Sequence, residues 1–214
     1  HTKKEKLLHV NTQVYYYKML RYCLNYAVSE ELISANPMNK IKNEEKPHKR
    51  RTEREYLTID ELRKLAQTPF YNGLLKKAFL FSCFCGLRHS DIIALTWGDI
   101  EMDDDGNARL YIIQKKTKEA ISLPLSQEAI KQLPKREDAK EDDIIFKKLI
   151  TLGRTNEILP KWAEQAGIKK HITFHTARHT HATMLLTLGV DLYTVSKLLG
   201  HTKVETTQIY AKII

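Results

Sequence analysis

The chain has 214 residues, of which 42% are hydrophobic and 29% are charged, with only 8 Gly and 6 Pro. This composition excludes a disordered or collagen-like chain and is typical of a helix-rich globular protein with a substantial core. Lys and Arg number 35 against 26 Asp and Glu, a net charge of +9, so a polyanion is the first partner to consider.

The first predicted element is an amphipathic helix over residues 12–30. Apolar side chains recur there at helical spacing, and Asn11 is a candidate N-cap. The pair Asn36-Pro37 follows, and a proline disfavours further helix before it. We therefore expect this helix to end before the proline and to belong to a small helical unit.

A polar segment over residues 40–51 follows and ends in a basic cluster that contains Arg50 and Arg51. Such a segment is typical of a linker, and it places a domain boundary between residues 43 and 55. The basic cluster is either a solvated charge run or a strap that contacts a polyanion.

The second domain begins with helices. Thr58-Ile59-Asp60-Glu61 has the spacing of a capping box, which predicts a helix start. Residues 74–85 are almost entirely apolar and predict a buried helix that ends near Gly86. A short helix over residues 89–95 comes next.

The hydrophobic period then changes to that of strands. Residues 110–113 and 120–124 predict a hairpin around a basic turn, and a short strand near 100–102 can join it. Helical patterns return after Ser126, at residues 126–133, 155–166, 176–188, 192–199 and 203–212. The predicted fold class is mainly α with a small three-stranded antiparallel sheet, an α+β domain.

Two features of the sequence argue against a membrane-spanning or a secreted protein. The longest nearly uncharged apolar stretch, residues 78–87, is about half of the roughly 20 residues that a membrane-spanning helix needs. No secretory signal pattern opens the chain, so we expect a cytoplasmic protein. The three cysteines, Cys23, Cys83 and Cys85, are expected to be buried reduced thiols.

Histidines gather in the last third of the chain and raise the question of a metal. His175 and His179 are four residues apart, but Thr176 stands where a zinc-protease helix carries its glutamate. The acidic clusters at residues 103–105 and 137–143 lie in predicted turns away from the histidines. We therefore expect no metal, and the absence of a phosphate-binding glycine loop gives no reason to expect a nucleotide cofactor.

Four separated motifs occur in a fixed order along the chain. They are Gly86-Leu87-Arg88-His89-Ser90-Asp91, Lys115-Lys116-Thr117-Lys118, His175-Thr176-Ala177-Arg178-His179, and Leu199-Gly200-His201 followed by Thr206-Thr207-Gln208-Ile209-Tyr210. Each motif alone is weak, but the conjunction over residues 55–212 resembles the tyrosine recombinase family, also called phage integrases. Residues 20–27 and Asn36-Pro37 resemble the end of that family's helical core-binding domain.

The resemblance implies a fold and an organisation. It implies the catalytic fold of the DNA breaking-rejoining enzymes, preceded by the end of a SAM-like core-binding domain. The expected domains are residues 1–46 for the core-binding part, 47–55 for a basic linker and 56–214 for the catalytic domain.

The resemblance also implies a role for each motif residue. Arg88 and Arg178 would bind the scissile phosphate, because a forked guanidinium suits its oxygens. Tyr210 would be the nucleophile and form a phosphotyrosine. His175 would accept or relay the tyrosine proton, and His201 would donate a hydrogen bond to the phosphate.

A lysine in the hairpin turn would protonate the leaving 5′-oxygen. The family pattern maps this role onto Lys116, with Lys115 and Lys118 as close competitors. Four further positions are candidates for contacts with DNA: Arg50, Arg51, Lys115 and Lys118. The remaining histidines of the motifs, His89, His179 and His181, are expected to serve in packing or helix capping.

These implications describe a site-specific recombinase that cleaves and rejoins DNA through a 3′-phosphotyrosyl intermediate, without metal or ATP, in the integration or excision of a mobile genetic element. Its expected partner is double-stranded DNA, on which it would form a homo-tetramer, with a monomer or weak dimer otherwise, at the nucleoid. Two alternatives stay open: a type IB topoisomerase-like enzyme, and a catalytically silent DNA-binding regulator of the same fold. A helix-turn-helix over residues 176–200 would explain neither Arg88 nor Tyr210.

Overall fold

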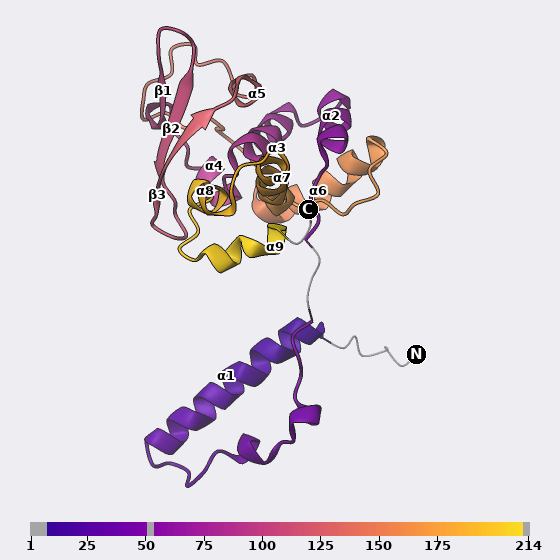
Figure 1. The fold of residues 1–214 in the computed structure, drawn as a ribbon, viewed down its shortest axis with the longest axis vertical. Coiled ribbons are helices and arrows are strands. Elements are labelled where there is room, and N and C mark those ends of the chain that lie inside the picture. Colours follow the sequence, from indigo (N-terminus) through magenta and orange to yellow (C-terminus); the bar gives the residue numbers. More distant parts are fainter. Residues whose placement is uncertain (1–7, 51–53, 212–214) are drawn as a thin grey trace. The chain divides into compact units, whose positions relative to one another are not determined.

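The computed structural model describes residues 8–50 and 54–211, which belong to two compact units, His1–Glu53 and Arg54–Ile214. Figure 1 shows both units as ribbons with their elements labelled. In the part of the chain that the structure describes, no helix is long and apolar enough to cross a membrane.

The first unit is built on one long helix, α1 (Val10–Ser29). Its cap differs from the prediction: His9 caps the helix, and its Nδ1 accepts a hydrogen bond from the backbone N–H of Asn11. The 3₁₀ turns η1 (Pro37–Lys40) and η2 (Asn43–Glu45) follow. Asn36 links them to the helix, because its side-chain amide donates to Asn25 Oδ1 at 2.6 Å while its Oδ1 caps the first turn.

The cysteine prediction needs one correction. All three thiols are free, and Cys83 and Cys85 are buried in the second unit, but Cys23 is exposed on α1. Helix α1 buries only Val14 within its own unit, and most of its aromatic side chains are exposed. The described residues of this unit therefore do not cover Cys23.

The second unit opens with α2 (Ile59–Gln67) and α3 (Gly73–Cys85). The predicted capping box is confirmed: the Thr58 hydroxyl accepts from the Glu61 N–H at 3.2 Å, and the Glu61 carboxylate accepts from the Thr58 N–H at 2.8 Å. Helix α3 is buried along most of its length and ends at Gly86, as its apolar sequence predicts. The next helix, α4 (His89–Ile92), is shorter than expected.

The predicted three-stranded antiparallel sheet is confirmed, with strand order β1-β2-β3. The strands are β1 (Ile100–Met102), β2 (Ala108–Ile113) and β3 (Ala120–Leu125). Leu110 faces Leu123 across the β2–β3 ladder, and both are buried. Alternate side chains of β3 point into the core, so one face of the sheet packs on the helices.

Helices form the rest of the second unit, as the return of the helical period predicts. They are α5 (Gln127–Ile130), α6 (Leu152–Gln165), α7 (Phe174–Thr187), α8 (Leu192–Leu198), the 3₁₀ turn η4 (Val204–Thr206) and α9 (Gln208–Ala211). Residue 212 of the last predicted helix lies outside the described residues.

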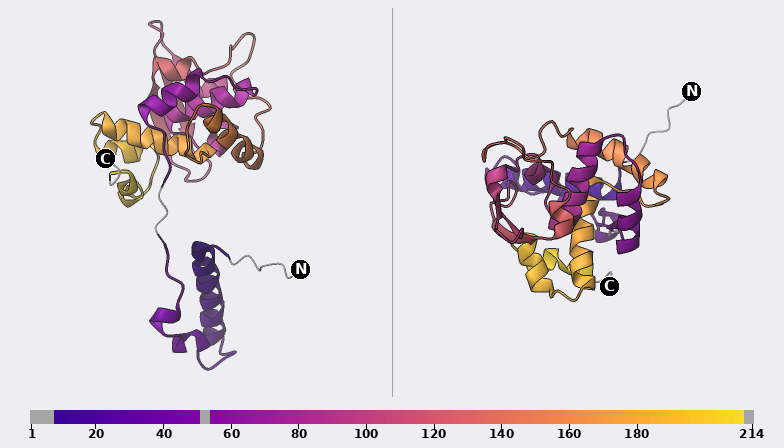
Figure 2. Two further views of the ribbon diagram at one scale, coloured as in Figure 1. Left: turned by 90° about the vertical axis from the view of Figure 1, so that its right-hand side faces the viewer. Right: turned by 90° about the horizontal axis from the view of Figure 1, so that it is seen from above.

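Helix α7 organises this unit, because it contacts α3, α6, α8 and α9. In Figure 1, α3 and α7 lie at its centre, with the sheet to one side. The two further views in Figure 2 show the yellow C-terminal helices together at one side of the unit. The middle of α7 is buried although it is rich in Thr, His and Arg, and most of these polar side chains bond to partners inside the protein.

Candidate active site

The predicted site residues of the second unit lie on four segments that tertiary packing joins. These are the α3–α4 junction, the β2–β3 turn, helix α7, and the stretch from the end of α8 to α9. They carry Arg88, Lys116, His175 with Arg178, and His201 with Tyr210.

Arg88 stands at the start of α4, two residues after the left-handed Gly86 that ends α3. Its Nη1 donates a hydrogen bond of 2.6 Å to Oε1 of Gln114 and lies 4.0 Å from a carboxylate oxygen of Asp91. Burial lowers the pKa of Arg88, and the charge of Asp91 partly restores it. The guanidinium remains a cation at neutral pH.

Arg178 on α7 is only 1% exposed. Its Nη1 donates to the Gly86 carbonyl at 2.8 Å, and its Nη2 donates to the Leu199 carbonyl. Burial, and then the charge of Arg88, lower its pKa to about 10, which keeps it protonated at neutral pH. These bonds tie α7 to the end of α3 and to the end of α8.

Tyr210 on α9 is 2% exposed, and its hydroxyl lies 2.7 Å from Nδ1 of His179. Burial raises the pKa of Tyr210, while the charges of Arg178, Arg54 and Arg88 oppose that rise. Since the phenol is neutral at pH 7, it either donates to an unprotonated Nδ1 or accepts from a protonated one. Arg54, which the sequence analysis did not single out, therefore acts on the same tyrosine as the two motif arginines.

The contact adds a hydrogen bond to the packing or capping role expected for His179. Burial, and then the neighbouring His175, lower the pKa of His179 to about 3, so the ring is neutral near pH 7. His175 lies edge-on to it, with ring centroids 4.6 Å apart. The structure thus places His179, and not His175, in hydrogen-bond contact with Tyr210.

His175 is exposed at the surface, but its ring is partly desolvated. This desolvation, and then the charge of Arg178, lower the pKa of His175 to about 4. His201 is half-buried, and its Nδ1 lies 2.7 Å from the Thr207 hydroxyl, which orients the ring. Burial, and then Arg178, lower the pKa of His201 to about 4. Both rings are neutral near pH 7.

The surroundings of the two other histidines of the motifs fit a packing role. His89 packs edge-on against Phe174 and contacts the Ile150 carbonyl at 3.1 Å through Nε2. His181 is 2% exposed and lies beside Gly86.

The three lysines of the β2–β3 turn are exposed, and the turn itself is fixed to the site. The backbone N–H of Lys115 donates to Asp91 Oδ1 at 3.0 Å, and Thr117 donates to Gln114 Oε1 at 2.8 Å. Lys118 has a left-handed backbone, with φ of 60°, and its N–H donates to the Gln114 carbonyl. Lys116 therefore stands in a turn whose backbone is anchored on both sides.

Sequence reasoning missed Asp91 and Gln114. Asp91 Oδ2 accepts from the Arg88 backbone N–H at 3.3 Å, so its spacing three residues after Arg88 was a readable capping signal. Gln114 offered a weaker signal, a polar residue directly after an apolar strand.

The two predicted linker arginines belong to the first unit, His1–Glu53. Arg50 is an exposed residue of the first unit, where its N–H donates to Asn11 Oδ1 at 2.9 Å. Arg51 lies outside the described residues.

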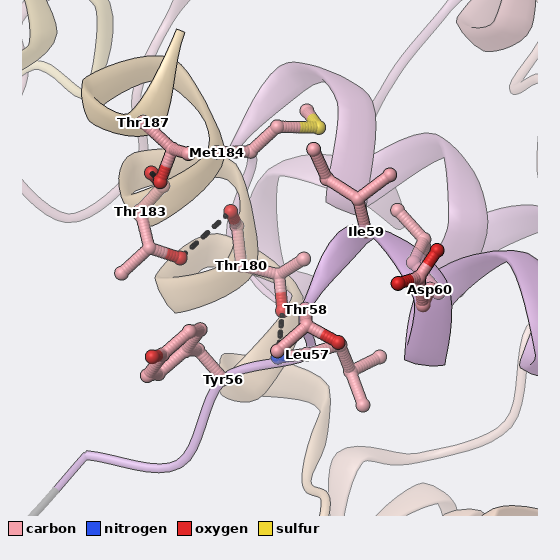
Figure 3. A pocket seen from close by; sticks show the side chains of 10 residues that line it. Tyr56, Leu57, Thr58, Ile59, Asp60, Thr180, Thr183, Met184 and Thr187 are labelled. Atoms are coloured by element: carbon pink, nitrogen blue, oxygen red, sulfur yellow. Dashed lines mark hydrogen bonds between the residues drawn. The ribbon is translucent and has the colours of Figure 1, made fainter. Parts of the chain in front are cut away.

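A separate pocket of about 200 Å³ lies between the segment before α2 and the side of α7 (Figure 3). Thr180 of α7 accepts a hydrogen bond of 2.9 Å from the Leu57 backbone N–H in its wall. None of the predicted catalytic residues lines it. Over residues 8–50 and 54–211, no group of three or more His, Cys, Asp or Glu side chains is arranged to hold a metal ion.

Comparison with known proteins gives two family matches. Residues 55–213 match the phage integrase family, and residues 1–67 match the phage integrase SAM-like domain. The chain is 32% identical to the tyrosine recombinase XerD of Listeria innocua over 217 residues, which cover 92% of this chain and 70% of that protein. It is 27% identical to the tyrosine recombinase XerC of Chlamydia pneumoniae, covering 88% of this chain and 63% of that protein.

Solved structures share the fold. A lambda integrase dimer bound to a COC′ core site matches with a TM-score of 0.70 and 22% identity, covering 90% of this chain and 70% of that one. The Tn1549 transposon integrase in complex with circular intermediate DNA matches with a TM-score of 0.71 and 18% identity, covering 97% and 76%. The chain thus spans about two thirds of the length of these relatives.

Proposed function

The chain belongs to the phage integrase family of tyrosine recombinases, and on that premise we propose that it cleaves and rejoins DNA strands at specific sites through a 3′-phosphotyrosyl intermediate. One observation carries the proposal: packing gathers Arg88, Arg178, His201 and Tyr210 from three of the four segments around the end of α3. The charges of both arginines act on the Tyr210 phenol, because each opposes the rise in the pKa of Tyr210.

The first step is an exchange of phosphoester bonds. The Tyr210 oxygen attacks phosphorus and loses its proton, the bond from phosphorus to the 5′-oxygen breaks, and that oxygen takes up a proton. Arg88 and Arg178 bind the non-bridging oxygens, whose charge rises in the pentacoordinate state. A 5′-hydroxyl then displaces the tyrosine by the reverse exchange, so no metal or ATP is needed to conserve the bond energy.

The proton transfers fall to the histidines and the turn lysine. His175 remains our proposed acceptor or relay for the tyrosine proton, and His179 is the group that contacts the phenol in the structure. His201, whose ring is oriented by Thr207, would donate to the phosphate. Lys116 would protonate the leaving oxygen, with Lys115 and Lys118 as competitors.

Double-stranded DNA is the proposed substrate. Relatives of the same fold are solved on DNA, including a lambda integrase tetramer bound to a Holliday junction. We propose that this protein likewise works on synapsed duplexes as a tetramer at the nucleoid and serves the movement of a mobile element. The domain assignment of residues 1–46, 47–55 and 56–214 is part of this proposal, with Arg50, Arg51, Lys115 and Lys118 contacting phosphates.

The test uses nicked duplexes, tiled across the DNA that flanks the gene and incubated with the full-length protein. The nick lets the short 5′-hydroxyl strand diffuse away, so a covalent adduct accumulates and survives denaturant. We expect an adduct with the wild type and none with Tyr210→Phe. The matched control is Tyr193→Phe, because Tyr193 is 59% exposed on α8 and should react like the wild type.

Binding without any adduct, while an unrelated recombinase reacts on its own site under the same conditions, would favour the silent regulator. Relaxation of supercoiled DNA of any sequence would favour the topoisomerase-like alternative.

A further inference from the structure

Gln114 is a fully buried polar side chain, 0% exposed, directly after strand β2. Its Oε1 accepts from Arg88 Nη1 at 2.6 Å and from the Thr117 hydroxyl at 2.8 Å. Its Nε2 donates to the Leu199 carbonyl at 3.1 Å. A guanidinium can only donate and a carbonyl can only accept, so the partners fix which end of the amide faces which side.

The amide is also confined by the backbone at the end of α8. A Cβ placed on Gly200 would lie 2.6 Å from Gln114 Oε1, which is closer than such atoms approach. Gly200 has a φ of +62°, a conformation that glycine adopts without strain. The Gln114 side chain therefore has little freedom to rotate, and the Arg88 guanidinium is bonded to a fixed acceptor.

This one amide bonds to three of the four segments that carry the proposed chemistry: the α3–α4 junction, the β2–β3 turn and the end of α8. It binds Arg88 directly, and through Leu199 it shares an acceptor with Arg178. Thr117 is the neighbour of Lys116, and Gly200 is the neighbour of His201. Loss of the amide would remove its bonds to Arg88, to Thr117 beside Lys116, and to the Leu199 carbonyl.

We propose, on the basis of the function proposed above, that Gln114 is a positioning residue that aims the Arg88 guanidinium at the scissile phosphate and sets the β2–β3 turn beside it. A neutral amide suits this task because it orients the guanidinium without cancelling its charge. Asp91, 4.0 Å from Arg88, already offsets part of that charge. A second carboxylate there would compete with the phosphate.

The test measures the rate of adduct formation by full-length variants on the nicked duplex on which the wild type reacts. Gln114→Met keeps the length of the side chain and removes its hydrogen bonds, and we expect a loss of about 10-fold to 100-fold. Gln114→Glu keeps an acceptor for Arg88 but adds a negative charge, and we expect a comparable loss. The matched control is Gln127→Met on α5, an exposed glutamine whose change should leave the rate within about twofold.

A second substrate separates positioning from general damage. A methylphosphonate at the scissile position removes the negative charge that Arg88 binds, so the loss caused by Gln114→Met should shrink to a few-fold, in parallel with that of Arg88→Ala. Gln114→Met should also add little to Arg88→Ala in the double variant. Gln114→Glu supplies the same comparison should the methionine variant fail to fold.

Four results would overturn the inference. Equal losses on the phosphate and the methylphosphonate would show that Gln114 only supports the fold. Additive losses with Arg88→Ala would show that it does not act through Arg88. A wild type that binds DNA but forms no adduct would overturn the proposed function, and the inference with it, whereas a reactive wild type matched by Gln114→Met would overturn the inference alone.

Discussion

The phenolic oxygen of Tyr210 lies 2.7 Å from Nδ1 of His179, between helices α9 and α7, in surroundings that leave the tyrosine 2% exposed. Attack on phosphorus needs a lone pair of this oxygen and the loss of its proton. The resting position of the proposed nucleophile therefore depends on a histidine that carries no role in the motif pattern.

The bond between His179 and Tyr210 predicts an energetic coupling in the folded protein. His179→Leu leaves a buried phenol without its partner, and we expect it to lower the free energy of unfolding by about 1–3 kcal/mol. The double variant with Tyr210→Phe should be more stable than the sum of the single changes predicts, by about 1 kcal/mol, because no orphaned group remains. Urea denaturation of the four proteins measures this coupling.

The control cycle pairs His179→Leu with Tyr193→Phe, whose hydroxyl is on an exposed side chain of α8. Those two changes should be additive. Additivity in the His179 and Tyr210 pair as well would mean that the hydrogen bond does not form in solution.

The choice among the turn lysines can be tested with a changed leaving group. Lys116→Met should slow adduct formation by about 100-fold or more, since the 5′-oxygen then departs without a proton donor. A bridging sulfur at that position leaves as a thiolate and needs no proton, so the variant should recover to near the wild-type rate on that substrate.

Lys115→Met and Lys118→Met serve as matched controls, because both side chains are exposed in the same turn. For these two variants we expect a modest loss in the rate of adduct formation, and we expect that the bridging sulfur does not restore the rate. Repair by sulfur in one of these two variants, and not in Lys116→Met, would move the proton donor to that lysine.

The buried histidines predict that stability falls in mild acid. His181 is deep in the core, where burial lowers its pKa to about 4, and the nearby Cys83 carbonyl offsets this only in part because neither ring nitrogen makes a full hydrogen bond to a described residue. Between about pH 4 and pH 6.5 the unfolded chain binds a proton that the folded ring does not. Stability should therefore drop as pH falls through this window, by about 1.4 kcal/mol per pH unit for such a group.

His181→Phe removes this titration and keeps an aromatic ring of related shape. The difference in free energy of unfolding between pH 6.5 and pH 5, measured with urea, should be smaller in the variant than in the wild type. An unchanged difference would show that His181 is not responsible for the acid sensitivity.

The close approach at Gly86 predicts a cost beyond that of its backbone conformation. Gly86 and Gly167 have nearly the same φ, +69° and +71°, but a Cβ on Gly86 would lie 2.7 Å from the His181 ring, while the space around Gly167 is open. Gly86→Ala should therefore lower the free energy of unfolding by at least about 1 kcal/mol more than Gly167→Ala does.

Gly86→Ala should also slow adduct formation more than Gly167→Ala does, because the Gly86 carbonyl accepts a hydrogen bond from Arg178. Equal effects of the two substitutions on stability would contradict the close packing of Gly86 against His181.

The sequence by itself determined most of the local structure. The capping box at Thr58 fixes where α2 begins, the apolar run before Gly86 specifies a buried helix, and the alternation around Leu110 and Leu123 specifies paired strands. These signals are readable because capping, helical periodicity and strand alternation act between residues close in the chain. The motif spacing likewise marked Arg88, Arg178 and Tyr210 as candidates.

Only the tertiary structure decided which of these residues contact one another. His179 and Tyr210 are 31 residues apart, and Gln114 and Leu199 are 85 apart, so their bonds depend on how α9 packs on α7 and how the sheet meets the end of α8. Spacing predicted that His175 and His179 share a helix face, but could not tell which ring meets the phenol. The burial that lowers the pKa of both histidines also arises from that packing.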